Sequence, residues 1–475
     1  MRLRVSVLAS LSLGLFLTGC PLTDRYQLLD EDAGAPNAGG DRPSGEGPGD
    51  RPPLGGLGGI GGGETGSAGV GEAGEPAANG GSDVTGTGGS GGSVELAGSG
   101  GSSGAPCVAT CNVKRACIAN ACAGGWVAMA TPPAQLVARS RAASVAMGKS
   151  VFIWGGLDNE GAALTDGAIY NPALDNWKYL PRDTGSPSGR IMSTAVWTGA
   201  ASNKVIVYGG TDAAGTMTYK DGAVYDVAEN SWAALPPGPM NSRRSASFGY
   251  WDGTRAVFYG GLNGTNSVAG ADRFDLKTWT VSGPSGDPGL LGFAAVAFDG
   301  SAMYLQGGVI GATRQDKVLS YTSSTDSWSS LSKSLSVRTG AFGAWDGTRF
   351  VVWGGQDDAG LRNDGKAMLG ATWTDLAASP LEGRRIAFRR SGWSFQVKLG
   401  VVAIIGGLTS TTGVGTLAIN GASYDFEKGQ WTSIPDWTSL ESHEYGIGVW
   451  TGEEFVIWGG RDQNVSTLTG ERWAP

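Results

Sequence analysis

The sequence predicts an all-β protein in which seven similar units stack in succession, and three observations support this fold class. Seven Gly-Gly doublets recur at intervals of 47 to 54 residues, from Gly155-Gly156 to Gly459-Gly460. Each doublet ends a short, largely apolar run that is typical of a buried strand, and aromatic residues follow at regular spacing. A unit of this size cannot bury its own hydrophobic faces, so the units must pack against one another.

Each unit carries four strand signals in a fixed order. The first is an apolar alternation such as residues 245–252, which ends in a tight Asp252-Gly253 turn. The second strand ends in the doublet, where glycine permits close backbone approach. The third and fourth strands are marked by an aromatic residue and then a Trp: Tyr170/Trp177, Tyr225/Trp232, Phe274/Trp279, Tyr321/Trp328, Tyr424/Trp431, and Met368/Trp373, in which Met368 replaces the aromatic.

This order of Gly-Gly, Tyr and Trp in units of about 50 residues resembles the kelch motif of β-propellers. The resemblance spans residues 126–475 and implies a seven-bladed, kelch-like propeller. It implies little about activity, because one such fold carries many functions.

The ends of the repeat region predict how the ring closes. After Gly460 only one more strand fits, with Trp473 at the aromatic position of a third strand. Residues 126–129 resemble residues 232–235, and Pro-Pro follows both segments. We therefore expect the N-terminal strand to complete the last blade, which leaves no open sheet edge.

Residues 1–20 predict a lipoprotein signal peptide. An apolar stretch follows two arginines and is too short for a spanning helix. The segment Leu17-Thr18-Gly19-Cys20 resembles the lipobox of bacterial lipoproteins, in which the cysteine is acylated, for example with palmitate. An ordinary cleaved signal peptide is the alternative. Pro21 after the cysteine favours the outer membrane, with the propeller periplasmic or exposed at the cell surface.

Residues 21–105 form a low-complexity linker of Gly, Ser, Pro, Ala and scattered acids, which predicts a disordered tether. The linker holds twelve Asp and Glu against three Arg, a net charge of −9, whereas the whole chain carries −8 and the signal peptide +2. Residues 106–475 therefore carry a net charge of only about −1. A near-neutral propeller argues against nucleic-acid binding, which needs a basic face.

A short segment, residues 106–125, contains Cys107, Cys111, Cys117 and Cys122. With Cys20 acylated, the remaining number is even, and export favours two disulfides. Three pairings are possible and the sequence does not select one, although we prefer Cys107–Cys122 with Cys111–Cys117. The irregular spacing argues against a zinc or iron–sulfur site, and no metal or cofactor is expected.

Two recurring polar positions supply the candidate binding residues. The second residue after the doublet is Asp158, Asp212, Asn263, Asp357 or Asp462 in five units. The loop before the first strand contributes Arg141, Arg190, Arg244, Arg338 and Arg385, with His443 in the last unit and Leu291 breaking the series in the fourth. In kelch-like propellers both loops lie at one mouth of the central channel. The residues either serve as turn residues and local ion pairs or present Arg and Asp to a ligand.

Tryptophans form a third set. We expect two groups of them in the core between blades. One group stands beside the doublets (Trp154, Trp353 and Trp458), and the other ends first strands (Trp197, Trp251, Trp345 and Trp450). Trp437 has no counterpart in the other units, so we expect it to be an exposed contact. The fourth unit instead offers an apolar sector at Leu290-Leu291 and Val309-Ile310.

His443 is the single histidine and the propeller region has no cysteine, which excludes a copper oxidase of the galactose-oxidase type. The sequence predicts a monomeric binding or scaffold propeller at the cell envelope, which touches the membrane through its lipid anchor only. Its partner would be a protein or a polysaccharide. One alternative is a metal-independent carbohydrate-active enzyme, similar to sialic-acid mutarotases, that uses Arg and Asp at the channel mouth. A purely structural envelope protein is the other alternative.

Overall fold

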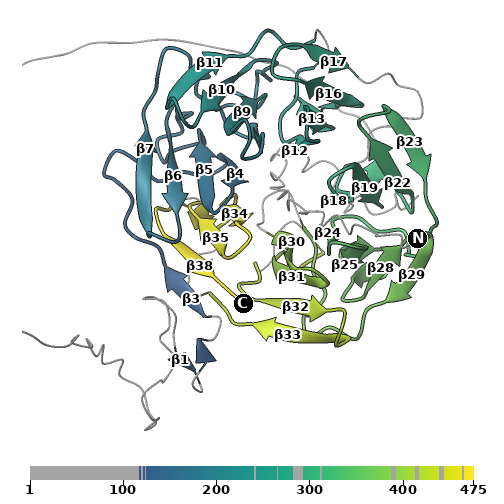
Figure 1. Cartoon of the computed structure of the whole chain (residues 1–475). Coiled ribbons are helices and arrows are strands. Elements are labelled where there is room, and N and C mark those ends of the chain that lie inside the picture. Colours follow the sequence, from purple (N-terminus) through teal and green to yellow (C-terminus); the bar gives the residue numbers. More distant parts are fainter. Residues whose placement is uncertain are drawn as a thin grey trace, which may run out of the picture. The chain divides into compact units, whose positions relative to one another are not determined.

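Seven four-stranded antiparallel sheets surround a central axis in the computed structural model (Figure 1). The structure describes residues 117–118, 121–122, 125–239, 242–264, 266–281, 292–310, 313–386, 392–411, 417–437, 443–462 and 465–475, and these contain strands and turns but no helix. The predicted all-β, seven-bladed propeller is therefore confirmed. The signal peptide, Cys20, the linker 21–105, Cys107 and Cys111 lie outside the described residues.

The blades follow the order of the chain, with the first strand of each blade innermost. Blades one to three contain β4 (Ala143–Met147), β5 (Ser150–Trp154), β6 (Gly167–Asn171) and β7 (Asn176–Leu180); β8 (Thr194–Trp197), β9 (Lys204–Tyr208), β10 (Gly222–Asp226) and β11 (Ser231–Ala234); β12 (Phe248–Trp251), β13 (Ala256–Tyr259), β16 (Ala271–Phe274) and β17 (Trp279–Val281). Blades four and five contain β18 (Ala295–Phe298), β19 (Ala302–Gln306), β22 (Val318–Thr322) and β23 (Ser327–Ser330); β24 (Phe342–Trp345), β25 (Phe350–Trp353), β28 (Gly365–Leu369) and β29 (Thr372–Asp375). Blades six and seven contain β30 (Gly392–Lys398), β31 (Val401–Gly406), β32 (Gly421–Asp425) and β33 (Gln430–Ile434); β34 (Ile447–Trp450), β35 (Phe455–Trp458), β38 (Gly470–Trp473) and β3 (Trp126–Ala128).

Short two-stranded hairpins decorate the ring. Four of them extend the connection between the second and third strands of a blade: β14 (Leu262–Asn263) with β15 (Asn266–Ser267), β20 (Val309–Ile310) with β21 (Thr313–Arg314), β26 (Gln356–Asp357) with β27 (Gly360–Leu361), and β36 (Arg461–Asp462) with β37 (Val465–Ser466). The fifth precedes the ring and pairs β1 (Cys117–Ile118) with β2 (Ala121–Cys122). Its backbone places Cys117 opposite Cys122, and the disulfide pairing stays a prediction.

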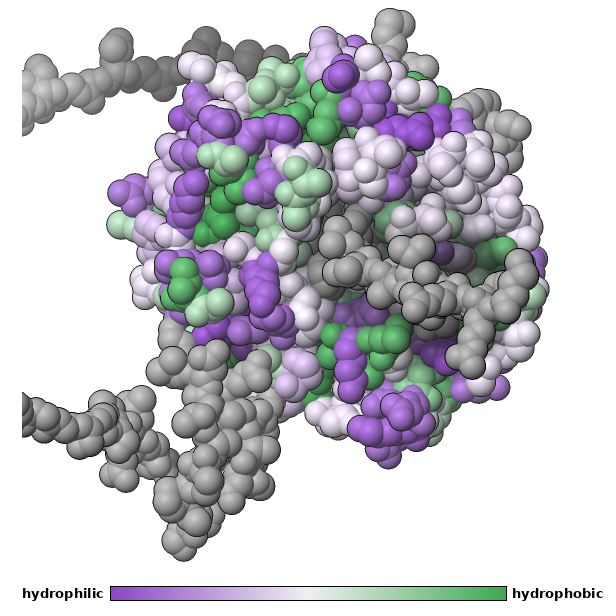
Figure 2. Space-filling view, in the orientation of Figure 1, coloured by the Kyte–Doolittle hydropathy of each residue, from purple (hydrophilic) through white to green (hydrophobic). Residues whose placement is uncertain are grey.

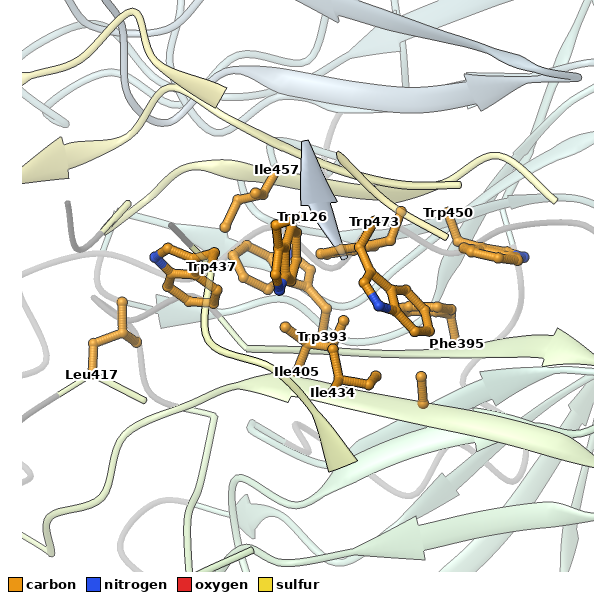
Figure 3. Packing of buried hydrophobic residues seen from close by; sticks show 12 residues of the cluster. Trp126, Trp393, Phe395, Ile405, Leu417, Ile434, Trp437, Trp450, Ile457 and Trp473 are labelled. Carbon is orange, nitrogen blue, oxygen red and sulfur yellow. The ribbon is translucent and has the colours of Figure 1, made fainter. Parts of the chain in front are cut away.

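The N-terminal strand β3 closes the ring, as the sequence predicts. It pairs with β38, and Trp126 lies opposite Trp473. The Trp126 indole packs edge-on against Trp437 at 5.9 Å and Phe455 at 6.2 Å between ring centroids, and its Nε1 donates to the Pro435 carbonyl at 2.7 Å (Figure 3). Buried aromatic area and a satisfied indole N–H together hold this strand in place.

Aromatic side chains fill most seams between blades. The aromatic residue that ends a second strand meets the outer-strand Trp of the following blade, with centroids separated by 4.4 Å in Trp154–Trp232, 4.6 Å in Tyr208–Trp279, 5.2 Å in Tyr259–Trp328, 6.1 Å in Trp353–Trp431 and 5.2 Å in Trp458–Trp177. Trp154, Trp353 and Trp458 are at most 1% exposed. The predicted inter-blade role of these tryptophans is confirmed. Among those that end first strands, Trp251 and Trp450 are buried, and Trp197 and Trp345 are partly buried.

Strand direction decides which loops share a face. Successive strands of a blade are antiparallel, so the connections between second and third strands and the connections between blades lie together at one face, here called the mouth face. The chain enters β3 from the opposite face, and it leaves β38 at that same opposite face. Both ends of the propeller therefore lie away from the mouth face.

Candidate binding face

Five arginines on the mouth face are buried rather than presented to solvent. Arg139, Arg190, Arg244, Arg338 and Arg384 are 2% exposed or less. In each, Nη1 donates to the carbonyl oxygen of the first glycine of the doublet in the same blade, at distances of 2.7 to 3.2 Å. His443 occupies this position in the last blade, with Nδ1 2.6 Å from the Gly459 oxygen.

The same arginines also join neighbouring blades through their backbone. The carbonyl of each arginine accepts the N–H of the second glycine of the preceding blade's doublet at 2.8 to 2.9 Å: Gly156 to Arg190, Gly210 to Arg244, Gly308 to Arg338, Gly355 to Arg384 and Gly460 to Arg139. We call this repeated arrangement the Arg latch. Glycine is needed here, because Gly156 has φ +104° and a Cβ on it would lie 2.7 Å from the Ser140 oxygen.

The Arg latch differs from the predicted arginine series at two positions. Arg190, Arg244, Arg338 and His443 stand at equivalent positions, but the first and sixth blades use Arg139 and Arg384 in place of Arg141 and Arg385. The separation from the doublet marks the first of these, because Arg139 precedes Gly155 by 16 residues, as Arg244 precedes Gly260 and Arg338 precedes Gly354. Arg190 and Arg384 depart from this spacing, since 19 and 22 residues separate them from Gly209 and Gly406.

Carboxylates accompany the latch, but they are not the predicted ones. Arg139 pairs with Asp166 at 3.0 Å, Arg190 with Asp221 at 3.1 Å, Arg244 with Asp272 at 2.7 Å and Arg338 with Asp364 at 3.1 Å. Burial raises the pKa of Asp364, yet hydrogen bonds from Arg362 and Arg338 outweigh it and hold this pKa below its usual value. Burial disfavours a charged guanidinium and therefore lowers the pKa of Arg139, although the carboxylate of Asp166 acts in the opposite direction.

The predicted aspartates on this face bind their own turns. Asp158 Oδ1 accepts the Ala162 N–H at 2.7 Å, and Asp212 Oδ1 accepts the N–H groups of Thr216 and Met217 at 2.7 and 2.9 Å. Burial raises the pKa of Asp212, but these bonds and the Thr216 hydroxyl lower it below its usual value.

The remaining members of the aspartate series lie in the small hairpins. Asp357 Oδ1 accepts the Ala359 N–H at 2.9 Å in the β26–β27 turn. Asp462 pairs with Val465 across β36 and β37, and Asn263 lies in β14. The structure thus brings both predicted sets to one face, where several members of each bond to local backbone: Asp158, Asp212, Asp357, Arg190, Arg244 and Arg338. Their role in ligand binding stays a prediction.

Trp437 is not the exposed contact that its unique position suggested. It is 2% exposed and belongs to the core cluster of Trp126 and Trp473 (Figure 3). The physical reason lies in its neighbour, since the residue before the doublet in blade six is Ile405, whereas five other blades carry an aromatic residue there. The Trp437 indole joins Ile405 in this cluster, and burying it there removes a large apolar surface from water.

Sequence reasoning missed a ring of backbone hydrogen bonds on the mouth face. Two residues after each latch position, seven residues line up from blade to blade: Arg141, Met192, Ala246, Phe293, Gly340, Ile386 and Tyr445. We call this set the mouth belt. Five inter-blade bonds of 2.7 to 2.9 Å connect its members: Arg141 N to Tyr445 O, Met192 N to Arg141 O, Ala246 N to Met192 O, Gly340 N to Phe293 O and Ile386 N to Gly340 O.

The mouth belt requires unusual backbone angles. Five of its non-glycine residues have φ between +50° and +60°: Arg141, Met192, Ala246, Phe293 and Tyr445. Left-handed conformations of this kind cost roughly 1–2 kcal/mol for residues with a Cβ, and such strain persists only where its surroundings impose it. Here the hydrogen bonds between blades impose it.

The belt side chains differ from one another in exposure. Met192, Ala246 and Tyr445 are buried, whereas Arg141, Phe293 and Ile386 are only partly buried. The Arg141 guanidinium lies over the Tyr445 ring, 4.4 Å from its centroid. The belt therefore offers a stacked cation from blade one and apolar side chains from blades four and six. Figure 2 shows hydrophilic and hydrophobic residues mixed around the ring on the side turned to the viewer.

Two features are absent from the part of the chain that the structure describes. There, no three His, Cys, Asp or Glu side chains gather as metal ligands would. Over those same ranges, no helix is long and apolar enough to cross a membrane.

The fold and the repeat geometry define a propeller with kelch-type blades, and comparison with known families agrees. Residues 141–335 match the family model described as the KLHDC2/KLHL20/DRC7 Kelch-repeats domain. The kelch-repeat match thus covers the first blades of the ring, and the structure as a whole is a seven-bladed β-propeller. Propellers of this kind commonly act as protein-interaction scaffolds. No curated protein matches the chain.

Proposed function

We propose that the chain is a binding propeller, held at the cell envelope by a lipid on Cys20, that recognises a protein through its mouth face. The kelch-repeat fold supports protein binding in general. The lipobox-like segment and the Gly-rich linker supply the anchor and the tether.

The position of the chain ends is the observation that carries this proposal. The tether joins the propeller at Trp126, on the face opposite the mouth, and the C-terminus ends at that same opposite face. The ring is therefore joined to the preceding chain away from the loops of the mouth face, which supports binding through those loops. In the described part of that face, the Arg latches and the mouth belt bond neighbouring blades to one another, and a preorganised surface loses less entropy on association.

The geometry gives less support to sugar chemistry at the same mouth. An acid–base mechanism needs Arg and carboxylate side chains that reach a substrate. Arg190, Arg244 and Arg338 instead donate to backbone carbonyls from positions that are at most 2% exposed.

Two matched double variants test the proposal by altering one face at a time. Val337→Arg with Val465→Arg places two charges on the mouth face, and Leu174→Arg with Leu399→Arg places two on the opposite face. All four side chains are exposed, at 39%, 58%, 69% and 72% respectively. Each chain, purified with Cys20→Ser so that it carries no lipid, is immobilised and exposed to envelope extract.

We expect the unaltered propeller and the opposite-face variant to retain the same protein and the mouth-face variant to lose it. Equal melting temperatures would show that all three chains are folded. Loss with the opposite-face variant alone would move the site to that face. Retention of no protein by any chain would favour the purely structural role.

A further inference from the structure

We propose that Cys117 and Cys122 are joined by a disulfide across the β1–β2 hairpin, which leaves Cys107 and Cys111 to pair with each other. This pairing differs from the nested one that we prefer from the sequence, and the backbone register of the hairpin is the reason. Formation of the bond in the cell rests on the proposed function, because thiols are oxidised in compartments outside the cytoplasm. The choice of partners rests on the hairpin alone.

The paired strands bring the backbones of the two cysteines together. In this antiparallel ladder Cys117 lies opposite Cys122, and Ile118 lies opposite Ala121. Directly opposed Cα atoms of antiparallel strands are about 4.5 or about 5.5 Å apart, depending on whether the pair is hydrogen-bonded. Disulfides span Cα separations of roughly 4.4–6.8 Å, so either kind of pair falls within the range that the bond needs.

A short connection fixes this register. Only two residues separate Ile118 from Ala121, and the length of a hairpin loop determines which residues of its two strands face each other. A slip by one residue would take Cys117 out of register with Cys122. The spacing C-x4-C and the two-residue connection therefore act together to place these two cysteines opposite each other.

The pairing of the other two cysteines follows by elimination. Cys107 and Cys111 lie outside the described residues, and Cys20 is proposed to carry the lipid. With the hairpin bond formed, Cys107 and Cys111 are the two cysteines that remain of the five in the chain. The proposed pattern thus gives two consecutive small loops, one on either side of the dipeptide 114–115, whereas the nested pattern closes loops that span this dipeptide.

Oxidation of the hairpin requires an acceptor of two electrons, which we assign to a thiol–disulfide oxidase of the envelope. The thiolate of one cysteine attacks the disulfide of the oxidase, and the second cysteine then displaces the oxidase from the mixed disulfide. One S–S bond forms in the hairpin and one breaks in the oxidase. The two protons and two electrons that the cysteines lose leave the oxidase with two thiols.

Trypsin distinguishes the proposed pairing from both alternatives, because it cuts after Lys114 and Arg115, between the two proposed pairs. The full-length chain is taken from the envelope, its free thiols are blocked with N-ethylmaleimide, and it is digested without reductant. We expect residues 116–139 to separate from the peptide that ends at Lys114. Each peptide should be free of maleimide and lighter by two hydrogen atoms than its reduced form. Peptides that stay joined until a reductant is added would overturn the pairing.

Two matched variants repeat the test from either side. Cys107→Ser should leave one reactive thiol, at Cys111, and keep the hairpin disulfide, whereas Cys117→Ser should leave one at Cys122 and keep the other bond. Maleimide on Cys117 or Cys122 in the Cys107→Ser chain would contradict the proposal. Both variants should melt at the temperature of the unaltered chain, because the two loops precede the ring.

A second arm separates the pairing from the proposed location in the envelope. The full-length chain is reduced with dithiothreitol, reoxidised in a mixture of reduced and oxidised glutathione, and digested in the same way. If the envelope sample carries maleimide on all four cysteines but the reoxidised chain gives two separate peptides, the pairing holds and the exported location fails. Four labelled cysteines in the reoxidised chain as well would overturn the inference.

Discussion

Arginine suits the latch because one side chain satisfies several buried carbonyls at once. Arg190 donates through Nη1 to the oxygens of Gly209 and Asp221 at 3.0 and 3.1 Å, and through Nε to Ser188 O at 2.9 Å. Burying a guanidinium is costly unless its donors are paired, and a planar fork of N–H groups meets that need with little loss of freedom.

Removing one latch should therefore lower stability more than removing an arginine of the belt. Arg338→Met leaves the Gly354 carbonyl without the donor that lies 3.1 Å away, and we expect the free energy of unfolding to fall by about 2 kcal/mol. Arg141→Met loses a cation–π contact with Tyr445, which is expected to cost about 1 kcal/mol or less. Urea unfolding measures both, and equal losses would contradict the structural role of the latch.

Buried tyrosines predict how stability changes in alkali. Burial raises the pKa of Tyr170 to about 12; the charge of Arg472 lowers this pKa and that of Glu454 raises it. Burial also raises the pKa of Tyr225 to about 12. In the unfolded chain the Tyr170 and Tyr225 hydroxyls ionise near pH 10, whereas in the folded chain they stay neutral until about pH 12. Their contribution to the free energy of unfolding is therefore complete below pH 10 and is lost as pH rises towards 12. Each contributes a slope of about −1.4 kcal/mol per pH unit in this window.

Tyr170→Phe is the matched variant for this alkaline effect. It removes the titrating hydroxyl and its 2.6 Å bond to Asp175, so it should be less stable at pH 8 but lose less stability between pH 10 and 12. Chemical unfolding at both pH values measures the difference. An unchanged slope would assign the alkaline loss to other groups.

At the scale of the element, five seams between blades share an aromatic–tryptophan contact, and the seam between blades four and five is one of the two exceptions. There β19 ends in Gln306, which is 1% exposed, and among the described residues neither its Oε1 nor its Nε2 has a hydrogen-bond partner. Five other blades carry Trp or Tyr at the corresponding position, and each of these rings packs on a tryptophan of the next blade. A buried unsatisfied amide is costly where an apolar side chain is not.

Gln306→Leu should consequently stabilise the propeller. Two unsatisfied polar atoms disappear and an aliphatic side chain of similar volume replaces them, so we expect the free energy of unfolding to rise by about 1 kcal/mol. Thermal and urea unfolding measure this gain. The control Tyr259→Leu, at the seam before it, should be destabilising, because it removes the ring that packs 5.2 Å from Trp328. A destabilised Gln306→Leu variant would mean that the amide has an essential role.

The elements themselves were predictable from the sequence because each strand carries a local mark. The doublets end second strands, and the Tyr–Trp pairs face each other across the third and fourth strands, as in Tyr225 opposite Trp232. The latch and belt were harder to predict. The loops before the first strands differ in length, and a positive φ at Met192 or Phe293 reflects hydrogen bonds from neighbouring blades rather than the residue itself. Burial of Trp437 similarly depends on Ile405, which is distant in the sequence.

At the scale of the whole molecule, the two ends of the propeller meet in one sheet. Arg472 of β38 strengthens the same junction, because its Nη1 donates to Glu454 at 3.0 Å in blade seven and to the Pro172 carbonyl of blade one at 2.5 Å. Closure therefore combines strand pairing, aromatic packing and a buried charge-assisted contact.

Deleting residues 126–130 should open the ring. The deletion exposes the edge of β38 and the apolar side chains that cover Trp126, so we expect a lower melting temperature together with oligomers in size-exclusion chromatography with light scattering. Trp126→Ala keeps the strand but loses the indole, and should lower stability by about 3 kcal/mol without oligomers. A monomer with an unchanged melting temperature after the deletion would contradict this mode of closure.

The antiparallel pairing of β3 with β38 also has a mechanical consequence. Under the proposed anchoring, a pull between a partner on the mouth face and a lipid on Cys20 would enter the propeller at Trp126 and run along the axis of β3. Such a force shears the pairs Trp126–Trp473, Val127–Arg472 and Ala128–Glu471 together instead of peeling them apart one by one. The shortest route for force through the molecule thus crosses its ring-closing strand in the direction in which a β-ladder is hardest to break.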